Sequence, residues 1–179
     1  MPDALFRLRV QVEGLGDIQR RIAAMPGVVQ RRILRGALRA GGSVLRKYLR
    51  REAPVSKERR LDYTGRAPHR SGALRRSVRV GVPFVRAGRV SVRISAGGRE
   101  AFYAHIVEGG AKAHRIARRA GGRALSIGGR FVAGAVNHPG FRGRFFARLA
   151  AAKGEQPAVQ AFRAYVDDKV SQYWRTGSV

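Results

Sequence analysis

Histidine and glutamate are the residue types in this sequence that could carry acid–base or metal chemistry, and their spacing suits neither. The histidines lie far apart, in no HxxxH or HExxH pattern that would turn two imidazoles toward one metal ion. They are His69, His105, His114 and His138. Glu100 and Glu108 fall on roughly one face of an expected helix, where paired carboxylates could exchange protons. In so basic a chain each is better explained as an arginine partner, and we expect neither a metal site nor catalysis.

Motifs for nucleotide binding and nucleophilic catalysis are also missing from the sequence. The many glycines form no GxxxxGK[ST] or GxGxxG loop that could cradle a phosphate. Ser71 and Ser77 lack the GxSxG surroundings of an activated serine. The chain has no cysteine, which excludes thiol chemistry, disulfides and cysteine-based zinc sites. We therefore expect a protein that is not an enzyme and that holds no cofactor.

The net charge points to binding rather than catalysis. The chain carries 37 lysine and arginine residues against 11 aspartate and glutamate residues, a formal net charge of +26. Almost all of the positive charge is arginine, whose planar guanidinium group pairs with carboxylate or phosphate in a fixed geometry. Codon usage in a GC-rich genome would give the same excess of arginine over lysine, and that explanation stays open. A charge this large opposes a lone compact monomer, so we expect acidic partners or DNA nearby.

Aromatic residues between the arginines could form a groove for phosphate and bases, but most lie in elements expected to supply the core. These residues are Phe84, Phe102, Tyr103, Phe131, Phe141, Phe145 and Phe146. No RRM, KH or helix-turn-helix signature is present. Sequence-specific recognition of nucleic acid is therefore not expected, whereas contact with passing DNA stays open.

The N-terminal part predicts a strand and two helices. Apolar and polar residues alternate over 6–12, the period of a half-buried strand, and a short helix over 17–24 ends at Pro26. Beyond Pro26, apolar residues recur at helical spacing as far as Leu49, so this is the longest helix. Its polar face is rich in arginine: Arg31, Arg32, Arg35, Arg39, Arg46 and Arg50. Each glycine of the pair Gly41-Gly42 costs a helix about 1 kcal/mol relative to alanine, which predicts a kink or a close backbone contact there.

A long basic loop is expected over 53–71. It contains two prolines and four arginines and shows no sustained periodicity. It is either a solvated insertion or a segment that becomes ordered on a neighbouring subunit. In the second case the residues that contact the partner would be arginines in and just after the loop: Arg59, Arg60, Arg66, Arg70, Arg75 and Arg76.

Two hairpins and three helices are expected after the loop. Alternating apolar residues from Leu74 to Ile94 predict a hairpin with its turn at 86–88, and 100–108 predicts a short helix with Phe102 and Ile106 inward. A second hairpin joins 125–127 to 131–136, and the chain then turns at 138–140. A helix over about 144–152 and a separate helix from Pro157 to Trp174 follow. The apolar stripe of the last helix is Val159, Phe162, Val166, Val170 and Tyr173.

These elements predict an α+β fold and a single domain over residues 1–179. A mainly antiparallel sheet is packed by the long N-terminal helix and by the C-terminal helix, with the basic loop inserted between them. The N-terminus lacks the layout of a signal peptide, and no apolar run is long enough to span a bilayer. We expect a product made in the cytoplasm that does not contact membranes.

Four segments in this order resemble a family of phage tail components found in the neck of the virion. They are VQVEGLGDIQRRIAAMP over 10–26, SGALRRSVRV over 71–80, AFYAHIVEGG over 101–110, and RALSIGGRFVAGAVNHPGFRGRFF over 123–146. The family's signature positions correspond to Tyr103, Glu108, Gly110, His138, Pro139, Gly140 and Phe146. Gly110 and Ala111 depart from the family's commoner aromatic-Gly-Thr run, and Arg144 stands near a place where the family usually has proline.

The resemblance implies a structural virion protein, made in the host bacterial cytoplasm and located in the neck. It would assemble as a homo-oligomeric, hexameric ring that completes the tail or joins it to the head around the DNA channel. Its partners would be neck, connector, tail-tube or terminator proteins, with contact to genomic DNA possible in the channel. The rival hypotheses are a basic, non-sequence-specific nucleic-acid-binding protein and, with no supporting motif, a small enzyme.

Overall fold

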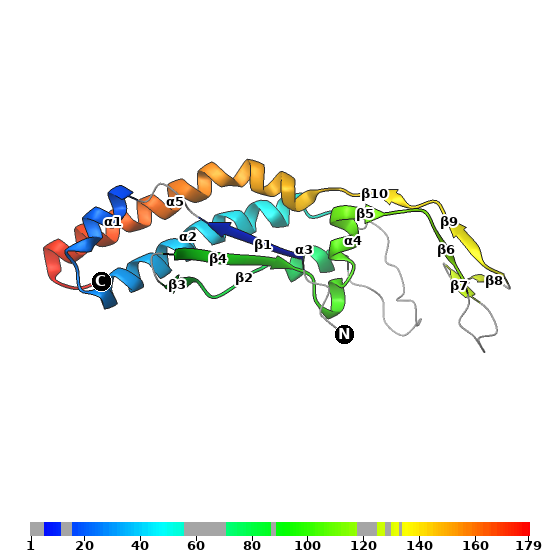
Figure 1. Ribbon diagram of the computed structural model, residues 1–179, viewed down its shortest axis with the longest axis horizontal. Coiled ribbons are helices and arrows are strands. Elements are labelled where there is room, and N and C mark those ends of the chain that lie inside the picture. The colour runs from blue at the N-terminus through cyan, green and yellow to red at the C-terminus, as the bar shows by residue number, and fades with distance from the viewer. Residues whose placement is uncertain are drawn as a thin grey trace.

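Two long helices lie along a small sheet, and a narrow β ribbon projects from one end (Figure 1). The computed structural model describes residues 6–11, 16–55, 71–86, 89–117, 125–127, 130–132 and 134–179. The fold is α+β, as expected from the order of the elements.

The helices α2 (Gly27–Glu52) and α5 (Phe146–Thr176) run antiparallel, side by side, and form the main body (Figure 1). Glycine brings them close together. A Cβ atom at Gly41 would lie 2.9 Å from the carbonyl oxygen of Ala158, and one at Gly154 would lie 2.9 Å from a methyl group of Leu45. Of the two predictions for the pair Gly41-Gly42, a kink or a close backbone contact, the close contact is confirmed at Gly41.

The C-terminal part contains one helix where two were expected. The prediction of a break before Pro157 was wrong, because α5 continues through this residue. A proline inside a helix removes one backbone hydrogen bond and crowds the preceding turn. Residues on both sides of Pro157 are buried against the body, among them Ala150 before it and Phe162 after it. This packing holds both halves of α5 on one axis.

Strand β4 (Arg89–Ala96) is the centre of the main sheet and pairs antiparallel with three other strands. These are β1 (Phe6–Gln11), β2 (Arg79–Val80) and β3 (Phe84–Arg86). The expected first strand is found. At the place of the expected hairpin, β3 pairs with β4, with Arg86 opposite Arg89, and residues 87 and 88 of its turn lie outside the described residues. Leu74, however, lies in the short helix α3 (Ala73–Ser77) rather than in a strand. The positive φ of Gly72 starts this helix, which inserts Leu74 into the core.

The core lies between the sheet and the long helices and falls into two clusters. One cluster joins α2, α3 and β4 to the start of α5. The other joins α1 (Gly16–Ala23) to the first half of α2 and the second half of α5. Three of the five residues of the expected stripe on α5 are buried: Phe162, Val166 and Val170. Gly42 faces the sheet, where a Cβ atom would lie 3.1 Å from Val80.

A short 3-10 turn, η1 (Arg99–Ala101), and the helix α4 (Ala104–Gly109) follow the sheet. The single helix expected over 100–108 is therefore interrupted at Phe102 and Tyr103, and the side chain of Phe102 is exposed rather than inward. Glu100 and Glu108 consequently do not lie on one continuous helix.

The arm, which comprises the described residues between 110 and 142, contains three successive antiparallel pairs of short strands. The pairs are β5 (Gly110–Ala111) with β10 (Phe141–Arg142), β6 (His114–Ile116) with β9 (Val136–His138), and β7 (Leu125–Ile127) with β8 (Arg130–Val132). Figure 1 shows it reaching away from the body beyond α4. The hairpin expected over 125–136 corresponds to the pair of β7 and β8. Val136, however, belongs to β9 and pairs with Ile116 of β6. The sequence did not predict the strand β6.

The aromatic residues expected in the core are mostly on the surface, and that prediction was wrong. Phe146 is 1% exposed and Tyr103 is partly buried, whereas Phe131 is 81% exposed. The other exposed members of the set are Phe84, Phe102, Phe141 and Phe145. Most of these rings belong to the arm or to its base, where a two-stranded ribbon has no second layer to cover them.

Replacing Gly41 by valine is expected to destabilise the fold. The Cβ and methyl groups would press on the backbone of α5, and overpacking of this kind costs about 1–3 kcal/mol. Gly27→Val, in the same helix, is the matched control, because a Cβ atom there would meet only Arg31 at an ordinary 3.5 Å. Urea unfolding of both variants measures the difference, and equal losses would contradict the close-contact role of Gly41.

Candidate interaction surfaces

The base of the arm is fastened to the start of α5 by Glu108. Its carboxylate accepts hydrogen bonds from the backbone N–H groups of Ala147, at 2.9 Å, and Arg148, at 3.3 Å. Its backbone oxygen accepts a hydrogen bond from the N–H of Phe145 at 3.2 Å. Phe145 has a positive φ of 47° and supplies no side-chain cap for the helix. Glu108 therefore caps α5 from a distant part of the sequence, where its negative charge also suits the helix dipole.

Glycines allow the two ends of the arm to meet. Gly110 has a φ of 81°, and a Cβ atom there would lie 2.5 Å from the carbonyl oxygen of Phe141. Gly140 has a φ of 79°, and a Cβ atom there would lie 2.4 Å from the carbonyl oxygen of Ala111. Both positions combine a left-handed backbone with a close approach, which only glycine tolerates. Residues 138–140, expected to form a turn, instead end β9 and link it to β10 on the same side of the arm, near its base.

The histidines of the arm pair with each other. His114 and His138 are cross-strand partners, and their rings stack with centroids 5.0 Å apart. Nδ1 of His138 accepts a hydrogen bond from the N–H of Gly140 at 3.0 Å. His105 lies in α4, with its Nδ1 atom 3.0 Å from the oxygen of Phe102, and His69 lies outside the described residues. Within the described ranges, no group of three His, Cys, Asp or Glu side chains could hold a metal ion.

The remaining signature positions support the base of the arm. Phe146 is buried at the first turn of α5. Tyr103 packs against the same core cluster, and burial raises the pKa of its phenol, opposed by a hydrogen bond to the backbone of Leu74 and by the charge of Arg76. The phenol therefore stays protonated at neutral pH. Tyr103, Glu108, Gly110, Gly140 and Phe146 thus meet at one structural junction, the base of the arm, and their standing as a family signature stays a prediction.

The arginines expected to contact partners are only partly described. Arg59, Arg60, Arg66 and Arg70 lie outside the described residues. Arg75 and Arg76 are exposed on α3, and Arg76 donates a hydrogen bond to the oxygen of Ser71 at 2.6 Å. Their part in partner binding stays a prediction.

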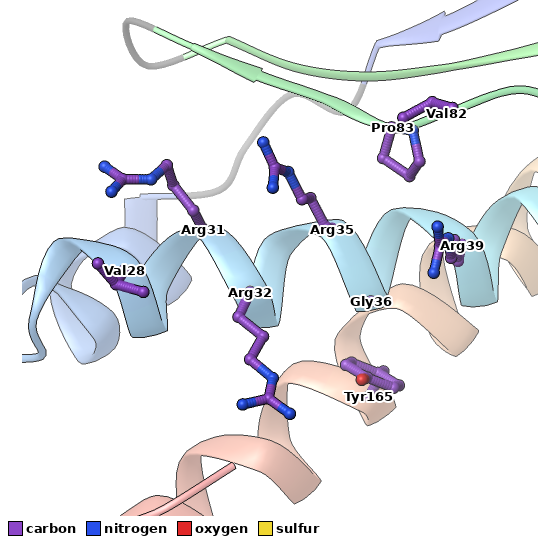
Figure 2. A pocket seen from close by; sticks show the side chains of 9 residues that line it. All are labelled: Val28, Arg31, Arg32, Arg35, Gly36, Arg39, Val82, Pro83 and Tyr165. Atoms are coloured by element: carbon purple, nitrogen blue, oxygen red, sulfur yellow. The ribbon is translucent and has the colours of Figure 1, made fainter.

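A second surface, the arginine groove, lies over the outer face of α2 and was not foreseen (Figure 2). Its cavity volume is about 790 Å³. It is lined by Val28, Arg31, Arg32, Arg35, Gly36 and Arg39 of α2, by Val82 and Pro83 before β3, and by Tyr165 of α5. Figure 2 shows Arg31 and Arg35 on the side of Val82 and Pro83, and Arg32 on the side of α5. Gly36 forms the floor, since a Cβ atom there would lie 2.3 Å from the hydroxyl of Tyr165.

The guanidinium groups of the groove repel one another. Arg31, Arg35 and Arg39 follow each other at four-residue spacing, and each like-charged pair of this kind destabilises a helix by about 0.2–0.5 kcal/mol. Among the described residues, the carboxylates that form ion pairs do so with lysines and arginines outside the groove. The pairs are Asp17 with Arg20, Asp167 with Arg21, Asp168 with Lys169, and Glu52 with both Arg51 and Lys153. In the sequence, the only sign of the groove is the four-residue spacing of the arginines. That spacing does not show that Val82 and Pro83 on one side and Tyr165 on the other flank the arginines.

Removing the Glu108 carboxylate is expected to loosen the junction between the arm and α5. Glu108→Ala should lower the free energy of unfolding by about 1 kcal/mol, the usual worth of a helix cap. Glu108→Gln should lose less, because its amide oxygen still accepts a hydrogen bond. Glu100→Ala, at an exposed position, is the control. Denaturant titration measures all three, and an equal loss in Glu100→Ala would argue against the cap.

Removing the positive charges of Arg31, Arg35 and Arg39 is expected to stabilise the free chain at low salt. The triple variant Arg31→Gln, Arg35→Gln and Arg39→Gln removes two like-charged pairs, worth about 0.5–1 kcal/mol together, at little change in helix propensity. Salt screens the same repulsion, so the gain in the thermal unfolding midpoint should disappear at high salt. A midpoint that falls at low salt would show that these arginines have stabilising partners within the chain.

Comparison with known protein families gives a match over the N-terminal half of the chain. The family described as "Bacteriophage HK97-gp10, putative tail-component" matches residues 16–110, from α1 to the first residue of the arm. No curated protein and no solved structure matches the chain. The described residues contain no helix that is both long and apolar enough to cross a membrane. Since the matched residues are more than half of the chain, it belongs to the HK97-gp10-like family of phage tail components and is a structural protein of the virion.

Proposed function

We propose that this tail component acts in the neck of the virion as a hexameric ring, which completes the tail or joins it to the head around the DNA channel. The observation that carries the proposal is the arm, which reaches away from the body with exposed aromatic side chains along it. The protein acts by binding and is not an enzyme. It is made in the host cytoplasm before assembly.

The structure of the arm supports a contact with a neighbouring copy. A two-stranded ribbon is only marginally stable in water without a layer to pack on. Phe131 lies close to its tip and is exposed, and Phe141 is exposed at its base. Burying a phenylalanine side chain contributes about 1.5–3 kcal/mol, enough to favour docking of the arm on another surface. When each arm contacts a different patch on the next subunit, the contacts repeat around an axis, and they close into a ring when the rotation between neighbours is a sixth of a turn.

The proposal includes contacts beyond the ring itself. Connector, tail-tube and terminator proteins would lie above and below it, and the arginines of the basic loop and of α3 would pair with acidic residues on these neighbours. Arginines that face the channel would contact the phosphates of the passing DNA. The alternative function, a basic nucleic-acid-binding protein that acts without a ring, draws support only from the net charge of +26.

The exposed aromatic ring of the arm allows a direct test. Phe131→Ser is expected to reduce ring formation on purified tails, and the number of joined particles, at least about tenfold, because the arm loses the burial that docks it. Trp174→Ser is the matched control, since Trp174 is also exposed but lies near the other end of α5. Native mass measurement counts the subunits bound to the tails, and electron microscopy counts the joined particles.

Two results would overturn the proposal. In the first, Phe131→Ser assembles as well as Trp174→Ser. In the second, the chain never forms a ring on tails but binds short duplex DNA tightly and in a strongly salt-dependent way, which favours the alternative.

A further inference from the structure

We propose that the arginine groove is a docking site for an acidic polypeptide segment that carries apolar side chains beside its carboxylates. The inference rests on the proposed function only in taking this segment to belong to a neighbouring protein of the virion. It assigns a partner chemistry to a surface separate from the arm.

The groove concentrates positive charge that no ion pair among the described residues balances. Arg31, Arg32, Arg35 and Arg39 are all exposed and line one cavity. Within the described residues, none of them takes part in an ion pair with a carboxylate. Their mutual repulsion is relieved when an anionic partner lies between them. The groove is therefore built for a ligand with several negative charges.

A second copy of this chain is poorly suited to supply those charges. Most of its described carboxylates are already engaged by other groups of the same chain: Asp17, Asp167, Asp168, Glu52 and Glu108. Glu108 is committed to the cap of α5, and Glu52 joins α2 to Lys153, whose hydrogen bond lowers the pKa of the carboxyl group. The complementary partner is consequently a different and more acidic molecule.

The apolar rim favours a polypeptide over a nucleic-acid backbone. Val82 is 84% exposed on one wall, and Val28 is 69% exposed at the end of the groove. Pro83, which is buried, and Tyr165, which is partly buried, also line the walls. A phosphodiester backbone would satisfy the guanidinium groups but would leave these side chains without apolar contacts. A segment with both carboxylates and aliphatic side chains would satisfy both parts of the groove.

The spacing of the arginines fits a regular segment. Residues four apart on a helix are about 6 Å apart along its axis, which places Arg31, Arg35 and Arg39 in an even row. Carboxylates four residues apart on a partner helix have the same separation. An acidic amphipathic helix laid along α2 would therefore meet the arginines in register. Its apolar side chains would lie against Val82 and Val28.

Synthetic probes test this assignment on the full-length chain. The first is a helical peptide with Glu at every fourth position and Leu beside each Glu, and the second replaces every Glu by Gln. The third is a short duplex DNA. Binding is measured by fluorescence anisotropy at low salt. We expect the Glu peptide to bind and the Gln peptide to bind at least about tenfold more weakly, since charge pairing is lost.

Variants then locate the binding site. Changing Arg31, Arg35 and Arg39 to Gln should weaken binding of the Glu peptide about tenfold. A control with the same loss of charge changes Lys47, Arg163 and Arg175 to Gln, all exposed outside the groove, and should stay within about twofold of the unmodified chain. Val82→Ser should weaken the Glu peptide but not the duplex. Circular dichroism and thermal unfolding confirm that each variant is folded.

Four outcomes would overturn the inference, the last of them a chain that does not bind the Glu peptide. An equal loss of peptide binding in the control triple variant would mean that only bulk charge matters. Equal binding of the Gln peptide would exclude carboxylate recognition. Loss of duplex binding alone in the groove variant would assign the groove to DNA. Ring formation is measured separately on tails, so a chain that forms rings but does not bind the Glu peptide refutes this inference and leaves the proposed function standing.

Discussion

The close contact between α2 and α5 is the constraint on which the rest of the structure depends. Gly41 faces the backbone of Ala158, and Gly154 faces Leu45, so the two axes approach as only glycine allows. This contact keeps α5 a single helix through Pro157, because buried residues on both sides of the proline pack against α2. It also sets where α5 begins, and the arm leaves the body at that point. The helix pair thus positions both candidate interaction surfaces.

Several carboxylates among the described residues of this basic chain hold the structure together. Glu108 caps α5 and ties the base of the arm to it, Glu52 joins α2 to α5 through Lys153, and Asp167 joins α5 to Arg21 of α1. Because these groups are engaged within the chain, most of the arginine charge is left facing outward. An assembly protein gains from this arrangement, since the excess charge is balanced only when acidic partners arrive.

In the proposed assembly, the arm and the groove have different chemical roles. The arm presents aromatic rings on a ribbon that has no layer to pack on, which suits the burial of apolar surface on a neighbour. The groove presents guanidinium groups between apolar walls, which suits a charged and partly apolar segment. A protein that must contact several different neighbours benefits from surfaces of different chemistry, because each surface then rejects the partners of the other.

The sequence by itself determined the α+β class, the long helix from Gly27, the main hairpin and the family, because helical and strand periodicity and local motifs carry that information. Only the tertiary structure decided which aromatic rings are buried, since Phe131 and Phe146 have the same hydrophobicity but only Phe146 has a layer above it. The role of Glu108 could not be predicted for a related reason, because the N–H groups that it caps lie 39 and 40 residues away in the sequence. The arginine spacing was visible in the sequence. That it forms a groove depends on Val82 and Tyr165, which only folding brings to its two sides.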